Sequence, residues 1–198
     1  MNKKLVSFAL FSLLLTGCGG DSGSLAAPSV EAANASSTAS PSAKSAEKSP
    51  RGNLVKQLGE GAGLTDEGKQ VVTFVVNSID VDVPCTGEFA QAPVNGHILV
   101  LDVSVVTDPA LADSPDPTFQ MNPYFFTEIA PNGTTSNADL ATAATYGCLS
   151  DAEVLPQMMG PGENVTGKVV LDMTNPSGTL VFKYGGAPAG WEWTYPSV

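Results

Sequence analysis

The sequence predicts an all-β fold, an antiparallel β-sandwich of about seven strands. Short runs rich in β-branched and aromatic residues recur along the chain after Leu54. Clusters of Gly, Pro and Asn separate these runs, and no long stretch repeats its apolar residues with the 3.6-residue period of a helix. These features together are typical of two packed sheets joined by tight turns.

The two longest strand candidates are Val71–Val81 and His97–Val106. In the second, alternation places Leu99, Leu101, Val103 and Val105 on one face. Its other face carries Ile98, Val100, Asp102, Ser104 and Val106.

Shorter candidates complete the sandwich, and turn residues separate them. We expect turns at Pro131–Gly133 and Gly160–Glu163, while Leu140–Ser150 is ambiguous and has room for a short helix. The remaining strand candidates are Tyr124–Ala130, Lys168–Met173, Thr179–Tyr184 and Trp191–Tyr195.

The order of these segments resembles a known family. The strings that carry the likeness are Gly96–Val105, Leu155-Pro156, Gly160–Glu163, Gly167–Asp172 and Leu180–Phe182. Over about residues 54–198 the chain is similar to the immunoglobulin-like domain of unknown function found on actinobacterial lipoproteins, and to a small secreted mycobacterial antigen. The resemblance implies an immunoglobulin-like sandwich at the cell surface. It implies no activity, and the Pro- and Asp-rich loop after Thr107 departs from the family pattern.

The acidic charge lies almost wholly in the last part of the chain. The formal net charge is −11, and residues 54–198 hold 17 acidic against four basic side chains. Nucleic acid and anionic lipid surfaces both require clustered Lys and Arg, so we expect neither as a partner. With one His and three Cys in the chain, a multi-histidine zinc site is impossible.

The N-terminus reads as a lipoprotein signal peptide over residues 1–17. Lys3 and Lys4 precede Leu5–Leu15, an apolar run of 11 residues, whereas a membrane-spanning helix needs about 20. Leu15-Thr16-Gly17-Cys18 follows directly and resembles the lipobox of bacterial lipoproteins. We therefore expect Cys18 to carry the lipid that anchors the protein on the extracytoplasmic side of the cell membrane, because two acyl chains suffice for stable anchoring.

Residues 18–53 are predicted to be a disordered tether. The segment Gly19–Pro50 consists mainly of Ala, Ser, Gly, Pro and Thr, and it contains no Ile, Phe, Trp or Tyr. Such a composition buries too little apolar surface to offset the entropy of ordering. The folded domain is then expected to span residues 54–198.

Cys85 and Cys148 are the two cysteines that remain after lipidation of Cys18. In an exported protein an even pair is most simply a disulfide. The alternative is a reactive thiol, which would need His97 as its base.

Three further residue sets invite a functional interpretation. A copper(I) site would use His97 with Met121, Met158, Met159 and Met173. A Ca²⁺ site would use the carboxylates of Asp108, Asp113 and Asp116. An aromatic stripe, if exposed, would stack on a ligand through Trp191, Trp193 and Tyr195. For each set the simpler interpretation is favoured: a surface or core His, a solvated loop, and core aromatics. We therefore assign no catalytic, cofactor-binding or metal-binding residue.

The sequence thus indicates a non-enzymatic bacterial surface lipoprotein whose sandwich binds an unknown envelope or extracellular partner, either a protein or a small ligand. The alternative is a carrier of a metal ion or a small molecule at the cell surface. Nothing in the sequence names the ligand.

The lipid anchor can be tested by detergent phase partitioning. The wild-type protein should enter the detergent phase, and Cys18→Ser should move to the aqueous phase because it lacks the acyl chains. Equal partitioning of the two proteins would disprove the lipobox assignment.

Overall fold

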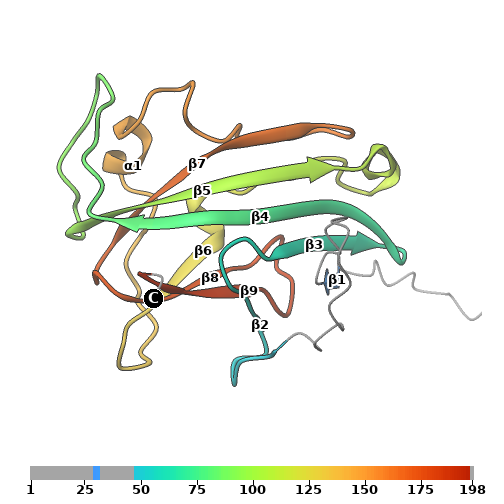
Figure 1. The fold of residues 1–198 in the computed structure, drawn as a ribbon, viewed down its shortest axis with the longest axis horizontal. Helices are drawn as coiled ribbons and strands as arrows, with labels where there is room; N and C mark the ends of the chain where they lie inside the picture. The colour runs from blue at the N-terminus through green and yellow to red at the C-terminus, as the bar shows by residue number, and fades with distance from the viewer. Residues whose placement is uncertain (1–28, 32–46, 197–198) are drawn as a thin grey trace, which may run out of the picture.

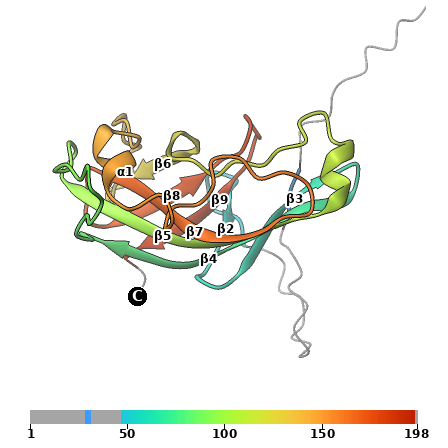
Figure 2. The same cartoon turned by 90° about the horizontal axis from the view of Figure 1, so that it is seen from above.

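The computed structural model describes residues 29–31 and 47–196, which form two β-sheets packed face to face (Figure 1, Figure 2). The first sheet has the order β1-β3-β4-β5-β7 and the second β2-β9-β8-β6. Neighbouring strands are antiparallel except β2 and β9, which are parallel. The strands of the first sheet are β1 (Ser29–Glu31), β3 (Gly61–Asp66), β4 (Lys69–Val81), β5 (His97–Thr107) and β7 (Asn164–Met173). Those of the second are β2 (Leu54–Val55), β6 (Phe126–Ile129), β8 (Gly178–Phe182) and β9 (Trp191–Tyr195).

The predicted β-sandwich is confirmed. The described residues contain nine strands against the expected seven or so. β2 has two residues and β3 carries two glycines, so neither gives a strand signal in the sequence. The ambiguous segment Leu140–Ser150 does contain a short helix, α1 (Ala143–Gly147).

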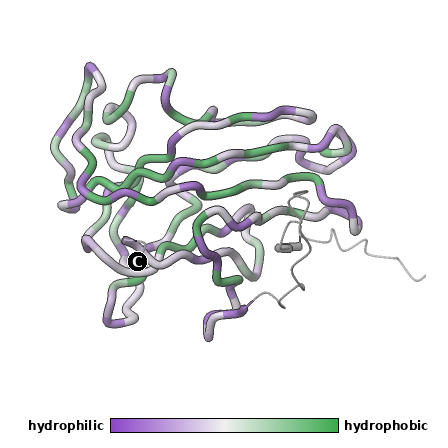
Figure 3. The backbone as a smooth tube through the Cα atoms, viewed as in Figure 1, coloured by the Kyte–Doolittle hydropathy of each residue, from purple (hydrophilic) through white to green (hydrophobic). Residues whose placement is uncertain are grey.

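The main core lies between the two sheets. Hydrophobic residues recur along β4, β5 and β7 (Figure 3). The first sheet supplies mainly aliphatic side chains and Phe74 to this core, and the second sheet supplies most of the aromatic ones. Trp191, Trp193 and Tyr195 are fully buried, so the aromatic stripe is core, as the simpler interpretation held. Trp191 packs edge-on against Phe74 and stacks on Phe182, which joins the two sheets.

The expected strand Tyr124–Ala130 begins later than predicted. A 3₁₀ turn, η2 (Pro123–Phe125), replaces its first residues. Pro123 has the fixed φ that suits the start of a helix, and the side chain of Asn122 accepts the N–H of Tyr124. The chain therefore turns here and directs Tyr124 away from the core.

Most of the predicted tether lies outside the described residues, but two pieces of it are described and both pair with the domain. Val30 in β1 is opposite Leu64 in β3. Asn53 is buried and bonds through its amide to Glu192 and to the N–H of Gly190. The folded part of the chain therefore begins before Leu54, because residues 47–53 carry polar side chains that bond to the end of the second sheet.

The outer face of the first sheet is apolar at one end. Ile98 and Val100 of β5 and Val170 of β7 are buried there under a cover formed by α1 and the loop that follows β4. This second, smaller core is separate from the main one. It explains why the alternating sequence of β5 has apolar residues on both faces.

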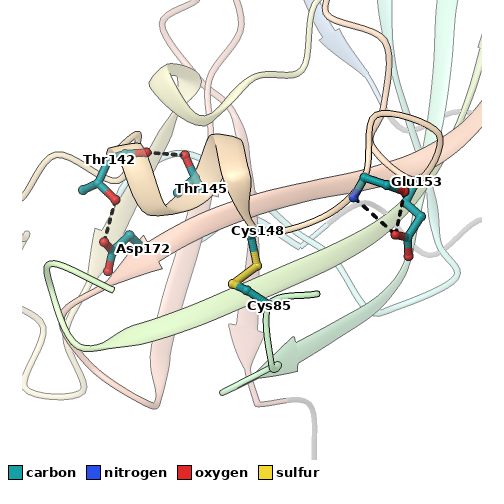
Figure 4. Close-up of a disulfide and its surroundings, with 7 residues drawn as sticks. Cys85, Thr142, Thr145, Cys148, Glu153 and Asp172 are labelled. Atoms are coloured by element: carbon teal, nitrogen blue, oxygen red, sulfur yellow. Dashed lines mark hydrogen bonds between the residues drawn. A yellow bond between two sulfur atoms is a disulfide. The ribbon is translucent and has the colours of Figure 1, made fainter. Parts of the chain in front are cut away.

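A disulfide between Cys85 and Cys148 fastens this cover (Figure 4). The two Cα atoms are 4.4 Å apart, and the N–H groups of Thr86 and Gly87 donate to the carbonyl of Cys148. The approach requires glycine, since a Cβ on Gly87 would lie 2.3 Å from the carbonyl oxygen of Gly147. The predicted disulfide is confirmed, and the reactive-thiol alternative is excluded because both sulfurs are used.

In the described part of the chain no helix combines the length and the hydropathy that a bilayer span requires.

The disulfide can be tested by replacing either cysteine. Cys85→Ser and Cys148→Ser should each lose about 2–4 kcal/mol of unfolding free energy, because the bond restricts the unfolded chain. The double variant should lose no more than either single one, since all three remove the same bond. Urea unfolding checks this, together with alkylation of the unreduced protein, which should label neither cysteine; two labelled thiols would contradict the bond.

Candidate functional site: a pocket at the edge of strand β7

A pocket of about 300 Å³ opens beside β7, on the edge that does not pair with β5. Lys168, Val169 and Val170 all line it. Consecutive strand residues point to opposite faces of a sheet, so a cavity that touches three in a row faces the strand edge-on. We call this cavity the β7-edge pocket.

The edge of β7 is covered on both sides of the pocket. On one side Lys168 exchanges backbone hydrogen bonds with Glu153 and Leu155. This close approach requires Gly167, because a Cβ there would lie 2.7 Å from the Leu155 backbone. On the other side the N–H of Asp172 donates to the carbonyl of Leu140. Between these two points the chain leaves the edge uncovered, and the pocket occupies the gap.

Three large side chains around the pocket are exposed: Tyr124 (68%), Tyr146 (54%) and Met158 (64%). They come from η2, α1 and the segment before β7, which are far apart in sequence. Three other large apolar side chains, Phe89, Val94 and Val106, are exposed elsewhere in the described domain, and none of them lines the pocket. The gathering of the three pocket residues around one cavity marks an interaction surface.

The two tyrosines are linked to each other. Partial burial, a hydrogen bond to the hydroxyl of Tyr124 and the negative charge of Asp139 raise the pKa of Tyr146 to about 12. The Tyr146 hydroxyl is therefore neutral at physiological pH. Each of the two rings presents an apolar face with a polar tip. Such a pair suits recognition of a ligand that is itself part apolar and part polar.

The basic group at the pocket is already paired. Lys168 Nζ lies 3.1 Å from a carboxylate oxygen of Glu153, and Ser150 donates to the same carboxylate. The hydrogen bonds from Ser150 and Lys168 hold the pKa of Glu153 below its ordinary value. Asp151 also lines the pocket, so its charged rim has no excess of positive charge.

Asp172 positions the wall that carries Tyr146. Its buried carboxylate accepts the N–H groups of Val94 and Asn95 and the hydroxyl of Thr142, which directly precedes α1 (Figure 4). One side chain of β7 thus holds both the loop after β4 and the start of α1. Together with the disulfide at the end of α1, this fixes the helix beside the pocket.

The residues singled out in the sequence lie elsewhere. His97 starts β5, and its Nδ1 is 2.7 Å from a carboxylate oxygen of Asp82. Met121, Met159 and Met173 are core residues, and Met121 also lines the β7-edge pocket together with the exposed Met158. Cys18 lies outside the described residues.

The Asp-rich loop gathers no metal-binding group. Asp108 caps the 3₁₀ turn η1 (Pro109–Asp113), and Asp116 accepts the hydroxyl of Thr118. Within residues 29–31 and 47–196 no three His, Cys, Asp or Glu side chains come close enough to hold an ion.

Sequence reasoning did not find the β7-edge pocket. Tyr124 was placed in a strand, and Tyr146 in an ambiguous segment. The available signal was Asn122-Pro123, which caps a turn rather than continuing a strand.

Comparison with known proteins gives one structural neighbour to report. The chain is similar to the crystal structure of MPT63, a secreted protein from Mycobacterium tuberculosis, with 15% sequence identity and a TM-score of 0.44 over 72% of this chain and 97% of that one. No protein-family model matches the chain. A search of curated proteins gave no match either.

The link between the tyrosines predicts a change in titration. Tyr124→Phe should lower the pKa of Tyr146, because it removes the hydrogen-bond partner and a nearby ionisable group. The pKa should stay above that of free tyrosine, since burial and Asp139 still act on the ring. NMR titration of the Tyr146 ring resonances measures this, with Phe89→Ser, an exposed aromatic outside the pocket, as control. An unchanged pKa would contradict the link.

Proposed function

We propose that this protein is a non-enzymatic bacterial surface lipoprotein whose sandwich domain binds an envelope or extracellular partner through the β7-edge pocket. The observation that carries the proposal is the gathering of Tyr124, Tyr146 and Met158 around an uncovered strand edge. Aromatic residues and methionine are the side chains enriched at recognition surfaces.

The location is supported by the sequence alone. The string Leu15–Cys18 after an apolar run of 11 residues is typical of lipidation at Cys18. A diacylglycerol with two chains would hold the protein at the membrane. The acidic domain would then present the pocket outside the cytoplasm, where the Cys85–Cys148 bond is stable.

A binding role is supported over catalysis by the chemistry of the pocket. The pKa of Tyr146 is raised, which is the wrong direction for a general base at neutral pH. Lys168 is held by Glu153, so its ammonium is not a free nucleophile. The remaining polar lining includes the amides of Gln120 and Gln157, which are groups that orient ligands, beside the hydroxyl of Thr145 and the carboxylate of Asp151.

The alternative is a small-molecule carrier at the cell surface. It is favoured by the volume of about 300 Å³, which is at the lower end for small-ligand sites. A metal-ion carrier has no comparable support from the described residues.

Site-specific photo-crosslinking in intact cells tests the proposal. A benzophenone amino acid at Met158 of the full-length protein should give one reproducible adduct on illumination. The Tyr146→Ser variant should lose that adduct, because the pocket loses a wall. The same probe at Phe89, which is exposed but outside the pocket, should not form it.

Two other outcomes would count against the proposal. Equal adducts from Met158 and Phe89 would show that contact is not specific to the pocket. Release of a bound small molecule from purified protein, with no macromolecular adduct, would favour the carrier alternative.

A further inference from the structure

We propose that the β7-edge pocket binds a three-residue stretch of extended polypeptide, with an apolar middle residue and a basic flank, by backbone pairing to Val170. This inference rests on the proposed function, since it takes the pocket as the binding site. It specifies the class of ligand and the atoms that recognise it.

The backbone of Val170 is free to pair. Along an antiparallel strand, successive residues direct their N–H and C=O groups alternately to the two neighbours. Lys168 and Asp172 use theirs on the side away from β5, so Val170, which lies midway between them, points the same way. No described residue forms a backbone hydrogen bond with Val170 on that side, and Val170 lines the pocket.

Residues 153–155 of the same chain begin to pair with the β7 edge, and this pairing then ends. Glu153 and Leu155 pair with Lys168 as a parallel strand would, and continued pairing would bring the next residues to Val170. The pairing ends after Leu155, and no backbone hydrogen bond joins Val170 to Gln157, whose N–H would be the next donor in a parallel ladder. The pocket is therefore a vacant position in an existing ladder, which is the arrangement used in β-strand addition.

The gap fixes the length of the ligand. Three strand residues lie between Lys168 and Asp172, and the four steps from one to the other span about 13 Å at 3.3 Å per residue. Val154 and Leu140 occupy the two ends. One residue therefore pairs with Val170, one more fits on each side of it, and a longer ligand must leave the pocket.

The walls favour an apolar middle residue. Residues directly opposite each other in a sheet have their side chains on the same face. Val170 packs outward beneath α1, so the middle side chain of the ligand would lie on the α1 side with Tyr146. Its neighbours would point to the other side, toward Tyr124 and Met121.

The charge favours a basic flank. Residues 54–198 carry 17 acidic and four basic side chains, and this excess attracts a cationic partner at long range. At the pocket, Glu153 neutralises Lys168 while Asp151 is available on the lining. A basic side chain of the peptide that reaches Asp151 has a partner there, and an acidic side chain has none.

Blocked tripeptides test the inference. The probes are Ac-Lys-Xaa-Lys-NH₂ with Val, Leu, Phe or Tyr in the middle, and the same series with Glu in place of Lys. Binding to the full-length protein is followed by NMR and titration calorimetry. At least one of the Lys peptides should bind and should slow hydrogen exchange of the Val170 amide. The matching Glu peptide should bind about threefold to tenfold more weakly, and the Lys peptide should bind the Tyr146→Ser variant more weakly by a similar factor. Phe89→Ser should leave the affinity unchanged.

N-methylation distinguishes backbone pairing from simple packing. In an antiparallel ligand the N–H of the middle residue faces Val170, whereas in a parallel ligand the N–H of the third residue does. Methylating one of these two nitrogens should therefore weaken binding, and methylating the other should not. If both methylated peptides bind like the parent, or both fail alike, backbone pairing is disproved.

The remaining outcomes separate the two proposals. If no tripeptide binds while the Met158 adduct persists, the peptide inference fails and the binding function stands. Binding of chitotriose, used as a saccharide probe, in place of the peptides would also overturn the inference. If the Met158 probe gives no adduct and no tripeptide binds, both the peptide inference and the proposed function are disproved.

Discussion

The arrangement of this domain depends on one constraint, which is that strands β5 and β7 are apolar on both faces at one end. A sandwich buries only one face of each sheet, so Ile98, Val100 and Val170 need a second cover. Two connections supply it, the loop after β4 and the segment that holds α1. The buried carboxylate of Asp172 bonds to both connections, and the disulfide joins them covalently.

The pocket exists because the covering segments leave part of the β7 edge uncovered. The covering segments meet β7 at Lys168 and at Asp172 but not between them. One segment leaves the edge after Leu155, and α1 lies beside the edge with Tyr146. An exposed strand edge usually invites unwanted pairing. Here the open stretch is one residue long and recessed between aromatic walls, so only a short chain can reach it.

Strands with a clear alternation of apolar residues were predictable from the sequence, and β9 (Trp191–Tyr195) was predicted with its bounds. The predictions failed where local preference competes with tertiary pairing. Gly61 and Gly63 weaken the strand signal of β3 in the sequence, yet β3 pairs with β4 along the whole length of β3. The disulfide followed from counting cysteines. The pocket did not, because Tyr124, Tyr146 and Met158 come together only through connections whose course depends on proline, on Asx capping and on Gly167.

The disulfide also gives the domain an order of assembly. Cys148 directly follows α1, and Cys85 lies in the loop beneath it. Before oxidation, the helix that carries Tyr146 is held to β5 and β7 by a few apolar contacts and by the Asp172 hydrogen bonds. Thiols stay reduced in the cytosol and pair in an oxidising space. In a chain that is exported before it is oxidised, the wall that carries Tyr146 would therefore become fixed last.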